Sequence, residues 1–345
     1  MKDPLVSIII VVYNNQDYIK RCIDSVLSAK YEPKEILVID NASTDNSPTI
    51  LSKFGNKIKL ISNASNTGYA QANNQGVKFS KGKYLFILNP DTVVTANFLE
   101  PLITTAETSS KIAACQPAIF LLHNKHTLNL SGKQTHYLGF DWIVNFESTT
   151  VPPKHEMVSF SGCGILINKE AMIAAHMFDE SYFMYYEDTD LSWKFRLLGY
   201  SMVFVPQSKI FHDYKLFPPE KYLQSKRKMS FLERNRLATV LKNYSAKTLV
   251  IIFIPLVTIE LAMTLFALIN GWFFTKIKGY SELWRSRAHL LKERAFIQNK
   301  RTVSDRAIVS EFSPTIDFVY ASNPVIKYLL NPLLCMYWQI FGKLV

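Results

Sequence analysis

The stretch Tyr84–Thr92 reads YLFILNPDT, an apolar run that stops at Asn89-Pro90-Asp91. Such a run is typical of a buried strand, and proline has no N–H to continue a ladder, so we expect the strand to end here with Asp91 on a stiff turn. In open α/β sheets, ligands bind beyond the carboxyl ends of the strands. An acid in that position can hold a divalent cation against a diphosphate, and the alternative is that it caps the following helix.

Two apolar runs that precede this stretch also lead into polar turns. Val6–Val12 (VSIIIVV) is β-branched almost throughout and is typical of a central parallel strand, and Ile36–Asp40 (ILVID) ends in an acid. Ile58–Ile61 is expected to form a third strand, and helical patterns alternate with the strands. This alternation predicts an α/β fold with a doubly wound, mostly parallel sheet, in which Asp40 and Asp91 converge on one crevice.

The segment Asn63–Gly76 (NASNTGYAQANNQG) is rich in small and amide residues. It contains no Walker lysine and no G-x-G-x-x-G pattern, which disfavours both a P-loop and a dinucleotide-binding fold. Small residues let a backbone approach a ligand closely, and amides bond base and ribose edges. A surface loop that leads into an ordinary helix is the alternative.

Length and composition narrow the class of protein. A chain of 345 residues exceeds the usual size of a single core, so a large domain with an appendage, or two domains, is expected. The four cysteines are scattered without metal-binding spacing, which fits a reducing compartment, and the N-terminus does not resemble a signal peptide. The net charge of +11 indicates an anionic partner, either a nucleotide, a nucleic acid or a phospholipid surface. No nucleic-acid module is evident, so we expect no nucleic-acid partner.

Four motifs occur in a specific order along the first half of the chain. They are VSIIIVVYN at 6–14, VIDNASTDNS at 38–47, the pattern Asn66-x-Gly68-x-Ala70 followed by Asn73-Asn74, and LNPDT at 88–92. Together they resemble an inverting family 2 glycosyltransferase of the GT-A fold, over roughly residues 5–245. We therefore expect a catalytic domain over 1–245 and a helical, membrane-associated or dimerising region over 246–345.

The resemblance implies a nucleotide-diphosphate sugar donor, with Asp40 near the base and Asp91 as the acid of a DxD-like metal-binding motif. The chain departs from a full DxD because Asn89 occupies the first acidic position. His212 matches a position where related transferases place a histidine that faces the metal or the diphosphate. The expected cofactor is Mg²⁺ or Mn²⁺, bound by Asp91 and His212. The residues expected to bind the donor are Tyr13, Asn15, Asp40, Asn66, Gly68, Asn73, Asn89 and Gly162.

The stretch Ser181–Tyr200 (SYFMYYEDTDLSWKFRLLGY) places three acids at the start of a predicted helix. Acids there favour the helix dipole, but three within four residues exceed what capping needs. The segment resembles the family's ED-x-D-L-x-W-R/K motif, which implies that Asp188 is the general base for the acceptor hydroxyl. Glu187 would orient Asp188 or bind the acceptor.

The segment Phe160–Ile167 (FSGCGILI) places Gly162 and Gly164 on either side of Cys163. The glycines can let a sugar pass closely, and a β-bulge explains them equally well. A buried, unreactive thiol is the simpler interpretation of Cys163.

The composition changes after Lys247. Thr248–Phe274 is almost wholly apolar and long enough to span a bilayer, but Pro255 and Glu260 interrupt it and basic residues lie on both sides. A helical hairpin that dips into one leaflet, or amphipathic helices that lie on it, fit this pattern better than a single span. A helical homodimer interface is the alternative.

These observations predict an inverting, metal-assisted glycosyltransferase at the cytoplasmic face of the cell membrane, either peripheral or monotopic. Its expected partners are a dTDP- or UDP-sugar, a lipid-linked saccharide or other cell-surface glycan acceptor, and an anionic membrane surface. The Leu138-Gly139-Phe140 neighbourhood resembles rhamnosyltransferases of the family. The alternatives are a polyprenyl-phosphate sugar synthase and a non-enzymatic membrane scaffold.

Overall fold

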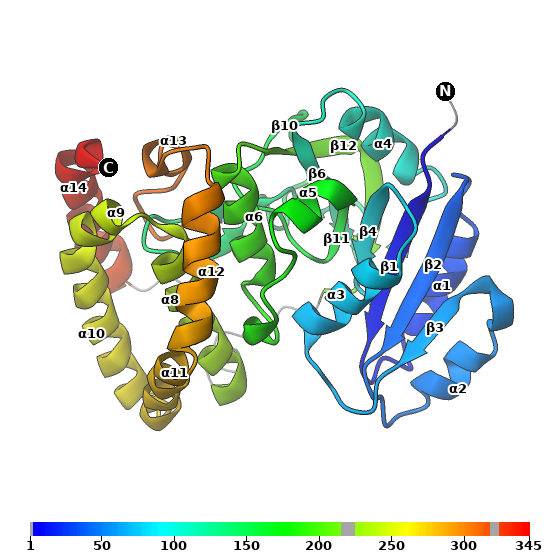
Figure 1. Cartoon of the computed structure of the whole chain (residues 1–345), viewed down its shortest axis with the longest axis horizontal. Helices are drawn as coiled ribbons and strands as arrows, with labels where there is room; N and C mark the ends of the chain where they lie inside the picture. Colours follow the sequence, from blue (N-terminus) through cyan, green and yellow to red (C-terminus); the bar gives the residue numbers. More distant parts are fainter. Residues whose placement is uncertain (1–2, 215–224, 318–323) are drawn as a thin grey trace. The chain divides into compact units, whose positions relative to one another are not determined.

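The computed structural model describes residues 3–214, 225–317 and 324–345 (Figure 1). Apart from the undescribed residues, the chain divides into two compact units. The first comprises 1–133, 143–195 and 200–215, and the second comprises 134–142, 196–199 and 216–345. The main division therefore falls near residue 215 rather than at 245, because the helix over 226–243 packs within the second unit.

The first unit is organised around a sheet of ten strands in the described part of the chain, in the order β10-β12-β6-β11-β4-β1-β2-β3, with β5 beside β12 and β7 beside β6. One half, β3-β2-β1-β4, is wholly parallel. In the other half, β11 lies antiparallel between β4 and β6, and β12 runs parallel to β6. The predicted α/β fold with a mostly parallel, doubly wound sheet is confirmed.

The strands of this sheet are β1 (Val6–Val12), β2 (Lys34–Asp40), β3 (Lys59–Ser62), β4 (Tyr84–Leu88), β5 (Thr92–Val94), β6 (Ile112–Leu121), β7 (Leu128–Leu130), β10 (His155–Glu156), β11 (Gly164–Asn168) and β12 (Ser201–His212). A separate two-stranded sheet contains β8 (Lys133–Thr135) and β9 (Asp141–Ile143). The helices of this unit are α1 (Ile19–Leu27), α2 (Ser47–Ser52), η1 (Gly55–Lys57), α3 (Tyr69–Phe79), α4 (Leu99–Ala106), α5 (Lys169–Ala174), η2 (Glu180–Tyr182) and α6 (Glu187–Leu197), whose last two residues belong to the second unit.

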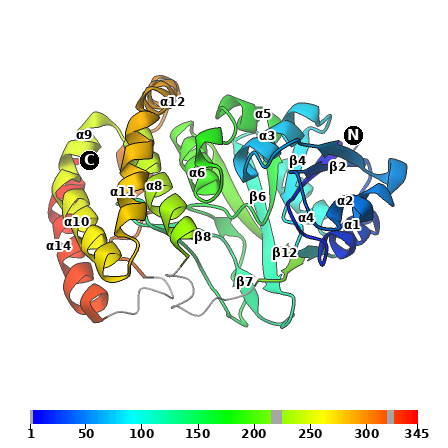
Figure 2. The ribbon, with the colours of Figure 1, turned by 90° about the horizontal axis from the view of Figure 1, so that it is seen from below.

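Helices cover both faces of the sheet because the central strands are apolar throughout (Figure 2). On one face, Ile8, Ile10 and Val12 of β1 share a buried core with residues of α1 and α4. On the other face, α3 approaches so closely that a Cβ at Gly76 would lie 2.4 Å from a methyl carbon of Ile9. The strands β1, β2 and β4 run in register, with Val12 opposite Asp40 and Ile10 opposite Leu88. The three polar turns that follow them therefore meet at one edge of the sheet.

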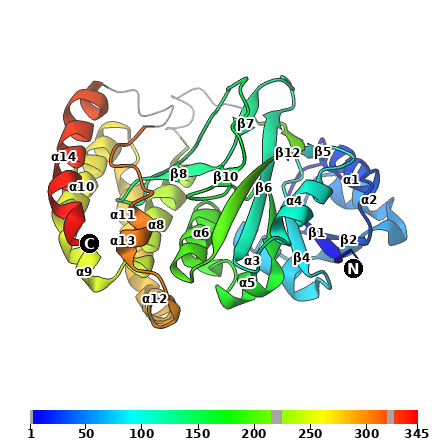
Figure 3. The ribbon, with the colours of Figure 1, turned by 90° about the horizontal axis from the view of Figure 1, so that it is seen from above.

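The second unit is helical in most of its described residues, which confirms the expected C-terminal helical region (Figure 3). Its elements are α8 (Lys226–Asn243), α9 (Ala246–Ile251), α10 (Phe253–Ile269), α11 (Phe273–Arg285), α12 (Arg287–Lys300), α13 (Asp305–Val309), the π-helix η4 (Ile326–Leu330), α14 (Asn331–Phe341) and η5 (Gly342–Leu344). Within the predicted C-terminal region 246–345, residues 318–323 lie outside the described residues.

The apolar stretch 248–274 is divided between α9, α10 and the start of α11, and its one acid points inward. Glu260 of α10 accepts hydrogen bonds from Arg236 of α8 and from Lys276 (3.1 Å) and Tyr280 (2.6 Å) of α11. Among the described residues, no helix combines the length and apolarity needed to cross a membrane. The acid that interrupts the apolar stretch therefore holds three helices together.

Candidate active site

The turns after β1 and β2 are joined by side-chain to backbone hydrogen bonds. Asn14, which has a left-handed backbone with φ 55°, accepts from the amides of Thr44 (2.8 Å) and Asp45 (3.3 Å) through Oδ1. The amide of Asn15 donates to Ser47 Oγ at 3.0 Å, and Asn15 Oδ1 accepts from the amide of Tyr13. Tyr13 itself is 44% exposed, so its ring is available to a ligand.

Asp40 lies at the end of β2 and accepts from the amide of Ser43 at 3.1 Å, so its side chain stabilises the turn. The next residue, Asn41, accepts from Thr67 and donates to Asn66 Oδ1 (3.0 Å) and to the Gly68 carbonyl (3.2 Å). These bonds bring the predicted residues Asp40, Asn66 and Gly68 to the same edge.

Gly68 is required by its surroundings at the start of α3. Its φ of +86° is left-handed, and a Cβ would lie 2.6 Å from the carbonyl oxygen of Phe183. Asn73, one turn further along α3, is fully buried: its Nδ2 donates to Tyr69 O at 2.9 Å, and its Oδ1 has no hydrogen-bond partner among the described residues. Asn73 is thus inside the helix packing rather than at the surface.

Asp91 lies beside His212, the last residue of β12. His212 Nε2 lies 3.3 Å from Asp91 Oδ1, and His212 Nδ1 lies 2.8 Å from Asn129 Oδ1, which fixes the ring. Burial alone would lower the pKa of His212, but the neighbouring Cys163 and the Asp91 carboxylate raise it to about 10. The second nitrogen of a metal-binding histidine is generally held by such a hydrogen bond, so this pair has the build of a cation site.

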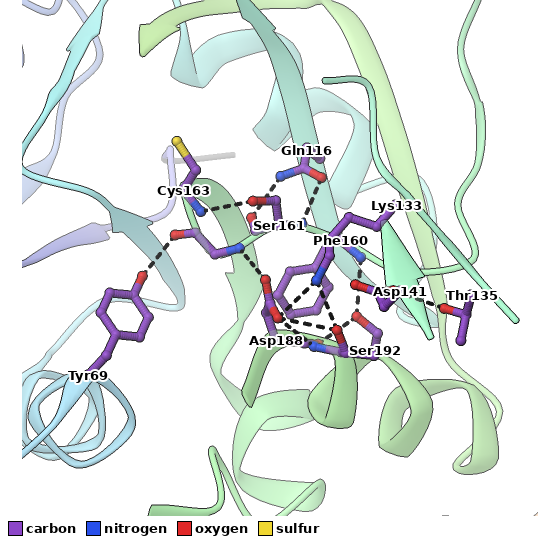
Figure 4. A network of polar contacts seen from close by, with 12 residues as sticks. Tyr69, Gln116, Lys133, Thr135, Asp141, Phe160, Ser161, Cys163, Asp188 and Ser192 are labelled. Atoms are coloured by element: carbon purple, nitrogen blue, oxygen red, sulfur yellow. Dashed lines mark hydrogen bonds and ion pairs between the residues drawn. The ribbon is translucent and has the colours of Figure 1, made fainter. Parts of the chain in front are cut away.

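The carboxylate of Asp188, near the start of α6, accepts four hydrogen bonds (Figure 4). Its Oδ1 accepts from Lys133 Nζ (3.0 Å) and from the amide (2.8 Å) and hydroxyl (3.4 Å) of Thr189, and its Oδ2 accepts from the amide of Gly162 (3.0 Å). Each carboxylate oxygen has about two acceptor positions, so Oδ2 retains one for a further donor. The Lys133 ammonium compensates the charge of the largely buried Asp188 side chain.

Glu187 is more deeply buried than Asp188, at 6% exposure, but Glu187 Oε2 has no hydrogen-bond partner among the described residues. Burial, followed by the charge of Asp188, raises the pKa of Glu187 to about 8. At neutral pH Glu187 therefore holds a proton for most of the time, whereas the charge of Asp188 is balanced by Lys133.

Tyr69 links the two acidic centres. Its hydroxyl lies 3.1 Å from Asn89 Oδ1 in the NPD turn and 2.9 Å from the carbonyl oxygen of Gly162, whose amide binds Asp188 (Figure 4). A Cβ at Gly162 would lie 3.2 Å from the Tyr69 hydroxyl, so a glycine suits this crowded position. Burial raises the pKa of Tyr69 well above its usual value, which keeps its hydroxyl protonated.

The turn that precedes the acids is strained. Phe183, Tyr185 and Tyr186 all have left-handed backbones, with φ between 62° and 71°. Bulky residues rarely adopt this conformation, which costs about 1–3 kcal/mol each and is concentrated at functional sites. The carbonyl of Phe183 accepts from the amide of Tyr69 at 2.6 Å, so this turn is tied to α3.

The structure also shows the surroundings of three other features noted in the sequence, which are Cys163, Gly164 and the segment Leu138-Gly139-Phe140. Burial raises the pKa of the Cys163 thiol, which fits an unreactive cysteine. A Cβ at Gly164 would lie 2.3 Å from Ile210, so this glycine permits the close packing of two strands. In the second unit, Leu138 O accepts from Arg236 and the Phe140 ring lies under the same guanidinium.

Lys133 and Asn129 were not predicted from the sequence. Both lie in the segment 123–156, which shows no hydrophobic period, and Lys133 is 55 residues away from Asp188 in the sequence. Tyr69 was quoted within the small-residue segment but received no role. A lone lysine, asparagine or tyrosine carries no motif, so only the folded chain identifies these three.

Comparison with known proteins agrees with this geometry. The family model "Glycosyl transferase family 2" matches residues 7–174. An uncharacterized glycosyltransferase of Rickettsia prowazekii is 32% identical over 195 residues, which are 56% of this chain and 58% of that protein. The poly-beta-1,6-N-acetyl-D-glucosamine synthase of Staphylococcus aureus (strain MSSA476) is 27% identical over 205 residues, which are 58% of this chain and 48% of the synthase. In both, the match spans less than two thirds of the relative.

Two solved structures share the fold. GalNAc-T7, crystallised with UDP, GalNAc and Mn²⁺, matches 71% of this chain and 49% of its own, with a TM-score of 0.59 and 19% identity. The mannosyltransferase PcManGT of Pyrobaculum calidifontis, in complex with GDP-Man and Mn²⁺, matches 99% of this chain and 89% of its own, with a TM-score of 0.52 and 16% identity. With these findings, residues 7–174 form a glycosyl transferase family 2 domain, and the sheet that contains them has the GT-A fold.

Proposed function

We propose that this chain transfers a sugar from a nucleotide-diphosphate sugar to a hydroxyl group, with inversion at the anomeric carbon. The observation that carries the proposal is the link between two acidic centres through Tyr69 and Gly162. One centre, Asp91 with His212, is suited to the diphosphate, and the other, Glu187 with Asp188, is suited to the attacking hydroxyl. An inverting transfer needs both groups at once, since the nucleophile enters as the diphosphate leaves.

A divalent cation fits the first centre. Mg²⁺ in nucleotide enzymes commonly uses only one or two protein ligands and takes its remaining ligands from phosphate oxygens and water. Asp91 Oδ1 and His212 Nε2 are 3.3 Å apart and would supply two ligands once cation binding releases the proton of His212, although the described residues hold no group of three or more metal-ligating side chains. When bound, the cation would stabilise the negative charge on the departing diphosphate. The Mn²⁺ found with the two structural neighbours supports this choice.

Asp188 is the better base of the acidic pair. The raised pKa of Glu187 keeps it protonated at neutral pH, and a protonated carboxyl cannot accept the acceptor's proton. Asp188 is compensated by Lys133 and retains one free acceptor position. Glu187 can instead donate its proton to an acceptor oxygen and so orient the acceptor.

The donor would lie along the edge formed by the turns after β1, β2 and β4. Exposed Tyr13 is placed to contact the base, and Asp40 lies nearby at the end of the paired strand. The amide of Asn89 donates to Cys163 O at 2.9 Å, which fixes the turn that carries Asn89 and Asp91. The proposed donor-binding residues are Tyr13, Asn15, Asp40, Asn66, Gly68, Asn89 and Gly162, whereas Asn73 is fully buried and would support α3 behind them.

We place the reaction at the cytoplasmic face of the cell membrane, with a lipid-linked saccharide or another cell-surface glycan precursor as acceptor and a UDP- or dTDP-sugar as donor. The similarity to a poly-beta-1,6-N-acetyl-D-glucosamine synthase supports a polysaccharide product. A hexosyl or deoxyhexosyl donor is expected, and the rhamnosyl preference indicated by Leu138-Gly139-Phe140 remains a prediction. A homodimer also remains a prediction.

The proposal can be tested by thermal unfolding of the purified chain with UDP, dTDP, GDP and CMP, each with and without Mn²⁺. A ligand at about a hundred times its dissociation constant adds roughly 2.7 kcal/mol to the folded state, which raises the midpoint by several degrees. We expect one nucleoside diphosphate to stabilise the chain when Mn²⁺ is present. Absence of any response to the four nucleotides would contradict the transferase and favour a membrane scaffold.

A polyprenyl-phosphate acceptor is the second possibility for the same site. A phosphate is already ionised, so transfer to it needs little help from a general base. Transfer that persists in Asp188→Asn would therefore favour a polyprenyl-phosphate sugar synthase.

A further inference from the structure

Two neighbouring helical segments of the second unit expose apolar side chains along one side each. In α10 these include Ile254, Val257, Leu261, Leu265 and Leu268, which are 39–67% exposed and recur every three or four residues. In η4 and α14 they are Leu329, Leu333, Met336 and Ile340, which are 51–59% exposed with the same spacing. We call these nine residues the apolar face.

The two segments lie side by side. Figures 2 and 3 both show α14 alongside α10. The Tyr337 hydroxyl of α14 donates at 2.6 Å to the carbonyl oxygen of Ile251, the last residue of α9, two residues before α10 begins. Contiguous exposed apolar surface of this kind marks an interaction site in soluble proteins.

The apolar face carries no charge along its length. The α14 sequence, NPLLCMYWQIF, contains no charged residue, and the single charge of α10, Glu260, pairs inside the unit with Arg236 and Lys276. Exposed lysines lie near the ends of the apolar face: Lys247 precedes α10, and Lys327 and Lys343 lie on either side of the stretch from Leu329 to Ile340. An uncharged stripe with basic ends matches a bilayer, where hydrocarbon lies beside anionic headgroups.

The distribution of charge along the chain points to the same partner. Residues 226–345 contain eighteen Lys and Arg against seven Asp and Glu, so they carry the entire net charge of +11, and residues 1–225 are neutral overall. A second copy of the chain would present the same basic ends and the same charge excess, which disfavours self-association. Anionic lipid complements both the charge and the apolar side chains.

We propose that the apolar face docks on an anionic lipid surface, with Lys247, Lys327 and Lys343 near its ends contacting lipid headgroups. This inference identifies the surface that would bind the membrane at the location proposed above. It does not depend on the transfer reaction.

The test is flotation of the purified full chain with vesicles of phosphatidylcholine alone and of phosphatidylcholine mixed with phosphatidylglycerol. We expect the wild-type chain to bind the mixed vesicles more tightly. Leu261→Glu combined with Leu265→Glu should weaken binding to both vesicle types by about a hundredfold or more, since each leucine buried in hydrocarbon contributes about tenfold. The matched control is Ile173→Glu, an equally exposed apolar residue of the first unit, which should bind as the wild type does.

A second variant separates charge from apolar contact. Lys327→Gln with Lys343→Gln should weaken binding to the anionic vesicles by about tenfold or more and leave binding to neutral vesicles unchanged. Circular dichroism and the nucleotide-induced thermal shift would show that each variant is folded. Vesicle binding without any nucleotide response would count against the transfer reaction alone.

Several results would overturn the inference. A wild-type chain that fails to float with anionic vesicles would do so, as would equal binding by the wild-type chain and the leucine variant. A wild-type dimer that the leucine variant converts to monomers, with no vesicle binding by either, would assign the apolar face to a second copy.

Discussion

Glu187 and Glu260 carry the same side chain into the interiors of two different units, with opposite results. Glu260 accepts hydrogen bonds from Arg236, Lys276 and Tyr280. Burial alone would raise the pKa of Glu260, but the two cations lower it to about 2. Glu187 has one buried oxygen without a hydrogen-bond partner among the described residues, and its pKa is raised to about 8.

This difference separates a structural carboxylate from a functional one. Glu260 belongs to a balanced set of two acids and two bases, Glu233, Glu260, Arg236 and Lys276, which joins α8, α10 and α11. Each charge in this set has a partner of opposite sign, and the ion pairs fix how α8, α10 and α11 pack together. Lys133 is the cation that Glu187 and Asp188 share. One cation cannot compensate two carboxylates, and an incompletely compensated acidic pair is typical of a catalytic site.

The largest effect is expected from Asp188→Asn, which removes the proposed base. Transfer from the donor identified by the thermal-unfolding panel should fall by about a thousandfold, because positioned general bases contribute about 10²–10⁴-fold. Nucleotide binding should be nearly unchanged, since the side-chain hydrogen bonds of Asp188 go to Lys133, Thr189 and Gly162, none of which lies in the turns after β1, β2 and β4. The measurement is release of the nucleoside diphosphate alongside its binding constant, and a parallel loss of binding would contradict the assigned role.

On the structural side of the comparison, Glu260→Gln should destabilise the chain by about 3–5 kcal/mol, because removing one partner of a buried pair leaves its cations uncompensated. Denaturant unfolding measures this difference. Glu311→Gln is the control, since Glu311 is exposed in the same unit and its replacement should change stability by less than about 0.5 kcal/mol. A loss below about 1 kcal/mol for Glu260→Gln would mean that the balanced set contributes little.

Asp91→Asn should weaken Mn²⁺-dependent nucleotide binding by about 10–100-fold and leave binding without metal unaltered. This range is what the loss of groups that hold or orient a metal commonly produces. Asn129→Ala, which removes the acceptor at His212 Nδ1, should give a smaller loss of the same kind. Titration calorimetry with and without Mn²⁺ would measure nucleotide binding by both variants. An equal loss of affinity in the absence of metal would mean that Asp91 contacts the nucleotide rather than the cation.

Glu187→Gln should change how stability depends on pH. The pKa of folded Glu187 is raised above its usual value of 4.5, so the native chain binds more protons than the unfolded chain between pH 4.5 and about 8. Stability that depends on Glu187 is therefore present at low pH and declines as the pH rises through this window. At pH 9 the glutamine variant should be more stable than the wild type, by up to about 5 kcal/mol for a shift from 4.5 to about 8, and at pH 5 the two should be similar.

Chemical unfolding at several pH values checks this prediction. Glu170→Gln, at an exposed acid of the same unit, is the control and should show no such dependence. A glutamine variant with the same pH profile as the wild type would mean that Glu187 titrates normally.

The sequence was sufficient to predict the fold and the strand end that carries Asp91. The apolar run that stops at Asn89-Pro90-Asp91 predicted both the end of β4 at Leu88 and the position of the acid. The motif order predicted the GT-A fold, because each motif lies at the end of a strand whose register brings it to one edge. Such motifs depend on a few neighbouring residues, so they can be recognised without knowledge of the fold.

The sequence was insufficient for the partners of the acids. Lys133 reaches Asp188 across 55 residues, and His212 finds Asn129 across 83, from a segment with no regular pattern. Glu260 was read as an interruption in an apolar stretch, and its inward pairing with Arg236 and Lys276 depends on how three helices pack. Pairing between residues far apart in the sequence therefore decides which carboxylate is compensated by cations and which can interact with a substrate.

The most direct test of this contrast is to titrate Glu187 and Glu260 individually, by carbon NMR of the chain labelled at the glutamate carboxyl carbon. Glu187→Gln and Glu260→Gln assign the two signals. We expect the Glu187 signal to shift with a midpoint near pH 8 and the Glu260 signal to stay in its charged form down to the acid limit of the folded chain. Midpoints near 4.5 for both residues would contradict the distinction between a functional and a structural acid.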